Sequence, residues 1–399
     1  MHSVNDYANL EPTLRVPDLK QALYDADPLF LTSTVVSLHG EEHKRKRRVV
    51  QSLFTREFFR QYQNRVFPLA LDETLAPVVA AGRGDLGTFS YRVLVNLVAD
   101  AAGLDRDHTE AQTDRMLEII TKLGKAPTIG QMLSGSIDEA RAEIQEALDL
   151  FKVSFYEHSA ARRRALIAKK AEDPSVDLPR DMLVCMLQAF DGEIEEDQLV
   201  RDTAFFILAG AFTQANALQN TMWEILTWCS AHPETRAELL TDPATLQKFI
   251  WESLRLHPAS PVARRKALCP MDLPDGASVD EEEIVDVNIG TGNRDNSVFG
   301  DDAATFNPYR ELPRRVPLYG ATFGAGAHAC VGRILAAGMP MAVAGDEEGE
   351  TEYGTLYLVV QALLEAGIEF DPDEAPVIDE STERKHFESF PFVLRQGQA

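Results

Sequence analysis

The sequence contains little cysteine and little positive charge. Its four cysteines, Cys185, Cys229, Cys269 and Cys330, form no C-x-x-C pair. We therefore expect neither a disulfide framework nor a zinc site, and this sparse usage is typical of a reducing cytoplasm. Lys and Arg number 39 against 63 Asp and Glu, which gives a net charge of −24. That surplus argues against nucleic acid and anionic membranes as partners.

Long apolar runs and obvious linkers are also missing. No stretch approaches the roughly 18–20 apolar residues that cross a bilayer, and the first six residues have neither the basic nor the apolar region of a signal peptide. We expect a soluble, cytoplasmic protein. No Pro/Gly/Ser-rich linker and no repeat divides the chain. We therefore expect one domain over 1–399, although a prior of about 150 residues per domain suggests two or three.

Helical periodicity dominates the rest of the chain. Strand-like pieces occur only around Val262–Ala267 and Glu283–Ile289. The sequence predicts a mainly α fold with small β-sheets. The longest predicted helix begins at Glu195 and stops before His232-Pro233, a length of about 55 Å. Apolar residues recur at three- and four-residue steps through 58–80, 91–103, 140–170, 181–190 and 195–231.

The most specific motif is a glycine-rich turn, Phe323-Gly-Ala-Gly-Ala-His328-Ala-Cys330-Val-Gly332, which precedes a helix that begins Arg333-Ile-Leu-Ala336. Glycines at 324, 326 and 332 allow positive φ angles and a close approach to a flat group. Open N–H groups at the helix start and the helix dipole favour a negative sulfur. A buried structural cysteine after a loop is the alternative interpretation.

This turn resembles the haem-binding signature of the cytochrome P450 family, FGxGxHxCxGxxLA, and the resemblance covers roughly residues 18 to 395. It implies that Cys330 is the axial iron ligand of haem b (iron protoporphyrin IX). In that family the thiolate favours cleavage of the O–O bond. The resemblance also implies that Phe323 shields the sulfur and that His328 points at a haem propionate. The other matched positions are Gly324, Gly326, Gly332 and Ala336.

The middle of the longest helix resembles the distal A-G-x-(D/E)-T motif of the family through Ala209, Gly210 and Thr213. The resemblance implies small residues that make room for dioxygen and a widened turn that exposes a hydroxyl. Phe212 replaces the acid, and Gln214 follows the threonine. Since phenylalanine cannot relay a proton and glutamine titrates poorly, protons come through water ordered by Thr213, from the substrate or from elsewhere. A plain core helix is the alternative interpretation.

An E-x-x-R pair lies on a predicted helix that ends at His257. Glu252 and Arg255 share one helical face. Such spacing by itself is typical of a surface ion pair. Because the pair precedes the cysteine turn and Arg310 lies between the two, it resembles the family's buried triad. The resemblance implies a structural role for Glu252, Arg255 and Arg310.

A basic run, His43-Lys-Arg-Lys-Arg-Arg48, is the local exception to the acidic composition. A solvated helix is one interpretation. Resemblance to the family's H-x-x-x-R motif implies that His43 and Arg47 bind the haem propionates, with Arg265 as a third donor. The other cations of the run, Lys44, Arg45, Lys46 and Arg48, then face solvent as a docking patch for an acidic ferredoxin.

Two segments depart from the family. A helix-like piece, Asp18–Leu23, follows only seventeen residues, so the N-terminal helix and β-hairpin are expected to be reduced. Gly338-Met-Pro340 should end the cysteine helix, and an acidic insertion follows at about 343–354. That insertion is interpreted as a solvated loop or as a partner-binding element.

The sequence therefore predicts a haem-thiolate monooxygenase that inserts one oxygen atom from O2 into a small apolar or partly apolar substrate, in secondary metabolism or catabolism. Electrons are expected from NAD(P)H through an external ferredoxin and its reductase. One alternative is a peroxide-driven, coupling, rearranging or dehydrating enzyme, which the replacement by Phe212 suggests. Another is a non-catalytic haem-binding protein.

Overall fold

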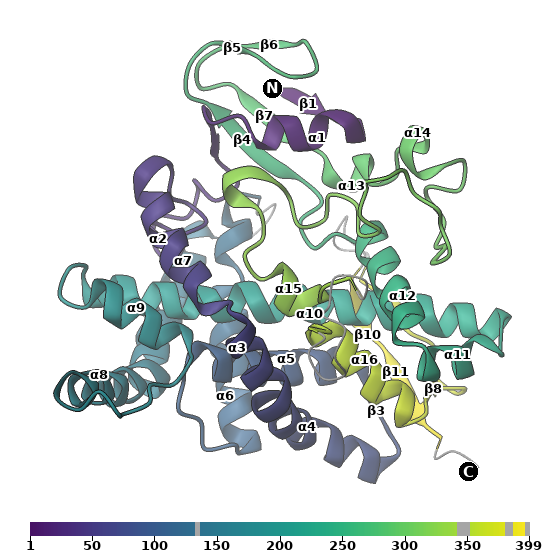
Figure 1. Ribbon diagram of the computed structural model, residues 1–399, viewed down its shortest axis with the longest axis horizontal. Helices are drawn as coiled ribbons and strands as arrows, with labels where there is room; N and C mark the ends of the chain where they lie inside the picture. The colour runs from purple at the N-terminus through teal and green to yellow at the C-terminus, as the bar shows by residue number, and fades with distance from the viewer. Residues whose placement is uncertain (132–135, 341–351, 380–385, 396–399) are drawn as a thin grey trace. The chain divides into compact units, whose positions relative to one another are not determined.

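The computed structural model describes residues 1–131, 136–340, 352–379 and 386–395, and its fold is mainly helical with small sheets, as predicted (Figure 1). Contacts divide the chain into two compact units. The first unit comprises residues 1–20, 71–90 and 213–399, and the second comprises 21–70 and 91–212. Three helices have residues in both units: α4 (Phe67–Ala81), α5 (Leu86–Ala102) and α10 (Glu196–Ala231).

The second unit is built from helices. Two predicted helices, over 58–80 and 140–170, are confirmed, and each contains one π-helical turn, η1 or η3. Such turns add one residue to the helical repeat. The residues of this unit outside α4, α5 and α10 form α2 (Gly40–Leu53), α3 (Arg56–Gln61), η1 (Tyr62–Val66), α6 (Glu110–Leu123), η2 (Ala126–Gln131), α7 (Ile137–Phe151), η3 (Lys152–Tyr156), α8 (Glu157–Glu172) and α9 (Met182–Phe190).

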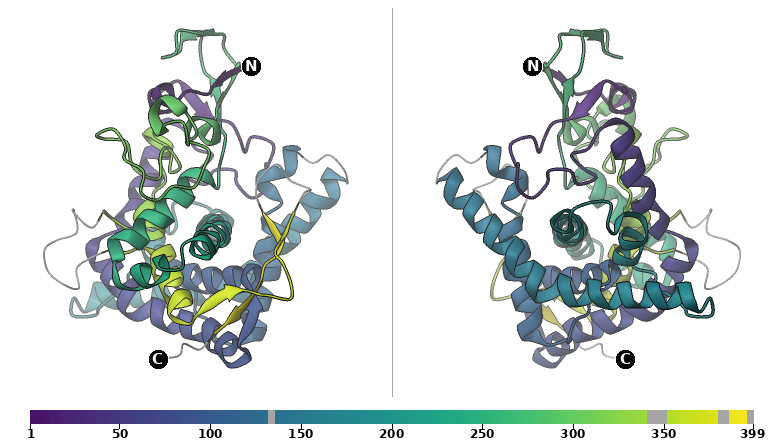
Figure 2. Two further views of the ribbon diagram at one scale, coloured as in Figure 1. Left: turned by 90° about the vertical axis from the view of Figure 1, so that its right-hand side faces the viewer. Right: turned by 90° about the vertical axis from the view of Figure 1, so that its left-hand side faces the viewer.

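Helix α10 confirms the longest prediction. It is α-helical from Glu196 to Ala231 and ends before Pro233, and Figure 2 looks nearly along its axis. The widened turn that the family resemblance implied is not present, because every residue of α10 is α-helical.

The first unit contains a sheet with the strand order β1-β7-β4-β2, in which β7 pairs parallel with β1 and antiparallel with β4. The expected helix over Asp18–Leu23 is wrong, because Leu19–Gln21 is strand β2 of this sheet. Leu19 and Gln21 are buried on either side of Lys20, which is the two-residue period of a strand. The other strands are β1 (His2–Val4), β4 (Ala263–Ala267) and β7 (Ile284–Val287).

The remaining elements of the first unit include a second sheet of order β3-β11-β8 and two hairpin pairs, β5 with β6 and β9 with β10. The strands are β3 (Arg83–Asp85), β5 (Met271–Asp272), β6 (Ser278–Val279), β8 (Ile368–Phe370), β9 (Val377–Ile378), β10 (Phe387–Ser389) and β11 (Pro391–Leu394). The helices are α1 (Tyr7–Leu14), α11 (Thr235–Thr241), α12 (Pro243–Leu256), α13 (Ile289–Gly292), α14 (Asn296–Phe299), η4 (Gly326–His328), α15 (Arg333–Ala337) and α16 (Thr355–Glu365).

Within the described ranges, no helix combines the length and the apolar character needed to cross a membrane. The expected acidic insertion at about 343–354 lies for the most part outside the described residues. The described residues on the two sides of the undescribed segment 341–351 meet, since the N–H of Met339 donates to the carbonyl of Glu352 at 2.9 Å.

Candidate functional site

The cysteine turn leaves open space beside an exposed thiol. Cys330 is exposed, and its backbone N–H donates to the carbonyl of Phe323 at 2.8 Å, which closes the turn. A Cβ added at Gly324 or Gly332 would have no neighbour within 4 Å. The turn therefore has room for a flat group next to the sulfur.

The glycines of the turn serve different purposes. Gly324 and Gly326 have φ angles of 63° and 68°, as expected, whereas Gly332 has a φ of −87° and needs no such freedom. A Cβ on Gly326 would lie 2.4 Å from the carbonyl oxygen of Leu14. Gly326 is thus required for the close approach of α1, and only Gly324 combines a positive φ with open space.

The helix after the cysteine is short and ends at Gly338, as predicted. Helix α15 begins at Arg333 and has 5 residues, ending where Gly338 takes a φ of 73°. A helix of that length carries only a small dipole, so the expected stabilisation of the sulfur by a helix start is weak here.

An aromatic chain fixes the turn to α12. The rings of Phe323 and Tyr319 meet edge to face with centroids 5.1 Å apart, and Tyr319 meets Trp251 of α12 in the same way at 5.7 Å. The indole N–H of Trp251 donates to the carbonyl of Ala337 at 2.8 Å. Sequence reasoning missed Tyr319 and Trp251, although Trp251 directly precedes Glu252.

The structure brings Glu252, Arg255 and Arg310 together. The Arg255 side chain donates two hydrogen bonds to the Glu252 carboxylate, at 2.6 and 2.8 Å, and both side chains are 0% exposed. Arg310 reaches Oε1 of Glu252 at 3.4 Å and also pairs with Asp302 at 2.5 Å. Glu252 is therefore a buried carboxylate held between two guanidinium groups.

Asn293 connects this cluster to the cysteine turn. Its fully buried amide donates to the carbonyl of Arg255 and to Oγ1 of Thr322, both at 3.0 Å, and its oxygen accepts the N–H of Ala321 at 2.8 Å. A Cβ on Gly320 would lie 2.3 Å from that oxygen. Nothing in the local sequence pattern distinguished Asn293.

Two further predicted cofactor contacts lie in the first unit. Arg265, on β4, is 4% exposed, and its guanidinium donates to the carbonyl of Arg264 at 3.0 Å. Its neighbour Arg264 pairs with Asp286 through two hydrogen bonds of 2.8 Å. His328 ends the short helix η4. The roles of Arg265 and His328 toward a propionate stay predictions.

Helix α2 of the second unit presents His43 and Arg47 one turn apart. His43 is buried and Arg47 is half-buried. Burial, and secondarily the charge of Arg47, lowers the pKa of His43 below its ordinary value. Its imidazole is therefore neutral at neutral pH and offers one N–H donor.

The expectation that Lys46 faces solvent is wrong. Lys46 is 7% exposed, and its ammonium donates to Asp202 of α10 at 2.7 Å and to the carbonyl of Ser33 at 2.6 Å. Of the other cations, Lys44 pairs with Glu41 and Arg45 with Glu193. The basic run is thus largely compensated by carboxylates.

The distal motif separates into two faces. Ala209 and Thr213 are exposed in the middle of α10, although Leu208, Ala211 and Gln214 beside them are buried. These two positions lie one turn apart, and their place beside dioxygen stays a prediction.

Gly210 and Phe212 face other helices of the second unit. A Cβ on Gly210 would lie 2.9 Å from Cγ1 of Val98 on α5, so this glycine is required for helix packing. The ring of Phe212 meets Tyr91 with centroids 4.9 Å apart, and one of its carbons lies 3.4 Å from the Cβ position of Gly124. Phe212 therefore fills the space between α5 and the end of α6.

The remaining cysteines take no part in these clusters. None of the four cysteines forms a disulfide in the described residues. Burial raises the pKa of the half-buried Cys185 and Cys229 thiols. No His, Cys, Asp and Glu cluster that could hold a metal occurs among the described residues.

Comparison with known families identifies one match over most of the chain. The family described as Cytochrome P450 matches residues 18–343. Pulcherriminic acid synthase from Bacillus subtilis is 25% identical over 348 residues, which cover 84% of this chain and 78% of the relative. Cytochrome P450 107B1 from Saccharopolyspora erythraea is 26% identical, over 80% of this chain and 67% of the relative.

Solved structures agree on the fold. P450BioI, solved with an acyl carrier protein ligated to hexadec-9Z-enoic acid, superposes with a TM-score of 0.72 at 17% identity, covering 98% of this chain and 92% of that one. CYP109E1 from Bacillus megaterium, solved with corticosterone, gives a TM-score of 0.71 at 17% identity over 98% of this chain and 92% of its own. At such low identity these similarities describe the fold alone.

Proposed function

Because the chain belongs to the cytochrome P450 family, we propose that this P450 monooxygenase inserts one oxygen atom from O2 into a small apolar or partly apolar molecule of secondary metabolism or catabolism. The single observation that carries the proposal is the exposed Cys330 thiol in a turn where Gly324 and Gly332 leave open space. We propose that electrons come from NAD(P)H through a ferredoxin and its reductase.

The residues of this chain fit a haem b group. Cys330 would hold the iron, Phe323 would lie beside the sulfur, and His43, Arg47, Arg265 and His328 would donate to the propionates. The open space at Gly324 and Gly332 is what a porphyrin edge requires, and a Cβ there would occupy it. A thiolate-bound haem supplies the iron that activates dioxygen.

Glu252, Arg255 and Arg310 would act structurally. Their cluster is buried and is connected to the cysteine turn through Asn293. They touch neither substrate nor cofactor in this proposal. Their task is to hold the backbone of the turn, so that the sulfur keeps its position.

Thr213 would organise proton delivery. Thr213 is exposed, and its hydroxyl is the one hydroxyl in the motif Ala209–Gln214. The Phe212 ring has no ionisable proton. The amide of Gln214 is buried and does not titrate. A water bound by Thr213 would therefore carry the proton to dioxygen.

A second candidate follows from the same residues. A peroxide-driven, coupling, rearranging or dehydrating reaction needs less proton delivery, and the motif Ala209–Gln214 contains no carboxylate to supply it. Both candidates are compatible with the relatives, whose names include a synthase and a C21 methyl hydroxylase, the latter 31% identical over 36% of this chain. A haem-binding protein without activity is the third.

The thiolate assignment is tested by Cys330→Ala. We expect this variant to lose the reduced-CO absorption typical of haem-thiolate proteins. Cys269→Ala, which removes the other exposed thiol, should keep it. The proposal is wrong if Cys330→Ala keeps the band or if the control loses it.

The oxidant is tested by comparing turnover with NADPH and surrogate partners against turnover with peroxide alone. Under the first candidate, Thr213→Ala should divert electrons from NADPH to free peroxide while the spectral shift on substrate binding persists. Thr227→Ala, at an exposed position of the same helix, is the matched control and should stay coupled. Equal coupling in both variants, with turnover by peroxide alone, would favour the second candidate, and no turnover with either oxidant the third.

A further inference from the structure

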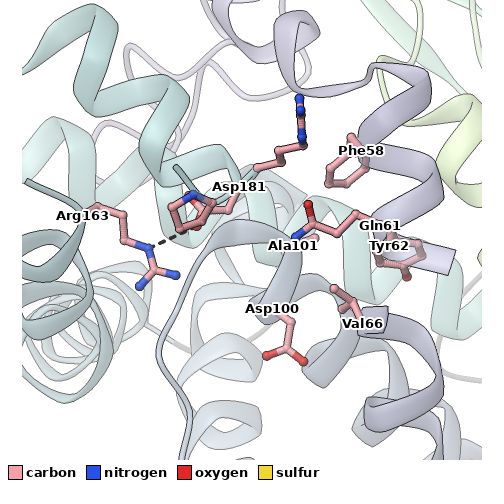
Figure 3. Close-up of a pocket in the computed structure, with 10 residues that line it drawn as sticks. Phe58, Gln61, Tyr62, Val66, Asp100, Ala101, Arg163 and Asp181 are labelled. Carbon is pink, nitrogen blue, oxygen red and sulfur yellow. Dashed lines mark hydrogen bonds and ion pairs between the residues drawn. The ribbon is translucent and has the colours of Figure 1, made fainter. Parts of the chain in front are cut away.

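A separate pocket lies within the second unit, and none of the residues assigned above lines it. Its cavity volume is about 160 Å³, and its walls come from α3, η1, the end of α5, α8 and the segment before α9 (Figure 3). A cavity of about 150 Å³ is known to hold one benzene ring. The pocket is therefore large enough for a single-ring molecule.

The two carboxylates in the pocket wall are already neutralised. Asp100 receives two hydrogen bonds from the Arg106 guanidinium, at 2.8 and 2.9 Å. Asp181 receives one from Arg163 at 3.1 Å and one from the backbone N–H of Val184 at 2.8 Å. These pairs are complete without a ligand, so the pocket has no open carboxylate for a cation.

Two polar groups of the wall have no partner among the described residues: the amide of Gln61 and the guanidinium of Arg180. Figure 3 shows the Gln61 amide pointing from α3 toward Asp181, across the middle of the pocket. Arg180 is exposed. Because Asp100 and Asp181 are paired, the unpaired charge in this wall is positive, in a chain whose net charge is −24.

Of the remaining wall residues, Arg163 is paired with Asp181, and the others are apolar or aromatic. Phe58 and Ala101 are 3% exposed, and Val66 and Pro179 are half-buried. The ring of Phe58 is itself held in place by a stacked contact with Tyr62, at 5.9 Å between centroids. A ligand of this pocket therefore needs a flat apolar body and an anionic end.

We propose that this pocket binds an aromatic monocarboxylate of about the size of benzoate. The carboxylate accepts hydrogen bonds from the guanidinium of Arg180 and the amide of Gln61, since guanidinium and carboxylate match in geometry. The ring lies against Phe58, Val66 and Ala101. The site requires neither the haem nor the residues of the distal motif. A failure of this proposal would therefore leave the proposed function unchanged, and the reverse also holds.

The test uses 4-fluorobenzoate as the probe and the haem-loaded protein as the receptor. Imidazole is present in excess to occupy the iron, and the Soret band is followed to show that the iron site does not change. Binding is read as broadening of the ¹⁹F resonance. We expect saturable broadening that unlabelled benzoate reverses and that benzamidine does not.

Arg180→Gln should weaken binding about tenfold, because it removes the charge and half of the donor pair. The matched control is Arg65→Gln, which removes an exposed arginine of η1 that does not line the pocket. It should bind as the wild type does.

Gln61→Glu replaces a neutral amide donor by a carboxylate of nearly the same size, so the pocket keeps its volume but gains a negative charge. This variant should lose 4-fluorobenzoate and gain affinity for 4-fluorobenzamidine. The proposal is overturned if the wild type does not broaden the resonance, if Arg180→Gln and Gln61→Glu bind as the wild type does, or if benzamidine displaces the probe better than benzoate.

Discussion

At the scale of single residues, Glu252 shows how burial changes the meaning of a common sequence pattern. The pair Glu252 and Arg255 is 0% exposed, whereas Arg115 and Glu118, at the same spacing, are 42% and 49% exposed. The sequence spacing is identical in the two cases. Only the burial shows that loss of one partner destabilises the first pair strongly and the second pair little.

We expect Glu252→Ala to give little soluble, haem-loaded protein. The substitution leaves two buried guanidinium groups without their carboxylate, at a cost of about 3–5 kcal/mol, which is a large part of a typical free energy of unfolding. Glu118→Ala removes one member of an exposed pair and should melt close to the wild type. Thermal unfolding and the ratio of Soret to protein absorbance measure both effects, and equal values for the two variants would contradict the assignment.

Some residue roles were readable from the sequence and others were not. The cysteine turn and the triad could be located because their residue types follow a recognisable spacing. Asn293 and Tyr319 could not be found that way, since their function depends on contacts with Thr322 and Phe323 that only the fold creates. Lys46 was misassigned because its partner Asp202 lies 156 positions away.

At the scale of elements, the sequence predicted the long helix α10 correctly, but it missed helix α6 and the short strand β2. The strong pattern through 195–231 matches α10 within one residue. Helix α6 was missed, although its buried residues recur at three- and four-residue steps. Segment Asp18–Leu23 was mistaken for a helix because three residues of strand show little periodicity.

The contacts between the end of α15 and the start of α16 indicate that the two are one interrupted helix. A Cβ on Gly354 would lie 2.3 Å from the nitrogen of Gly338, so the two ends touch. Oγ1 of Thr355 donates to the carbonyl of Leu335 at 2.9 Å. A threonine makes this bond to the residue four positions before it in a helix, and Thr355 takes that position if residues 338–353 are left out.

We therefore expect excision of residues 338–353 to give a continuous helix and a folded, haem-loaded protein. Closing a loop of this length costs on the order of 2 kcal/mol, so the melting temperature should rise. Excision of 338–354 is the control, because one residue fewer rotates α16 by about 100° and misplaces its buried face. Loss of haem in the first variant, or its retention in the control, would contradict the interpretation.

At the scale of the whole molecule, the family match over residues 18–343 draws on both compact units. This supports the expectation of one domain over 1–399, which stays a prediction, as does the reduced N-terminal hairpin. The chain length alone could not predict the two units, because each is assembled from separated segments of the chain. The matched region ends at residue 343, within the acidic insertion.

Charge is the property that acts over the whole molecule. The basic run on α2 was expected to attract an acidic ferredoxin, yet Lys46 is buried against Asp202, and Glu41 and Glu193 pair with two of the remaining cations. Its local attraction is therefore small beside a net charge of −24. At low salt the Debye length is about 30 Å, so a partner approaching from solution experiences the charge of the whole molecule.

We expect the association rate with an acidic [2Fe–2S] ferredoxin to rise when the ionic strength is raised from about 0.01 M to 0.15 M, because screening removes a net repulsion. Stopped-flow reduction of the haem iron under CO, at several ferredoxin concentrations, measures this rate. Glu193→Gln frees Arg45 and should raise the rate at low salt, whereas Glu118→Gln on α6 makes the same change in net charge and controls for it. A rate that falls steadily with added salt would mean that the α2 cations outweigh the molecule's overall charge.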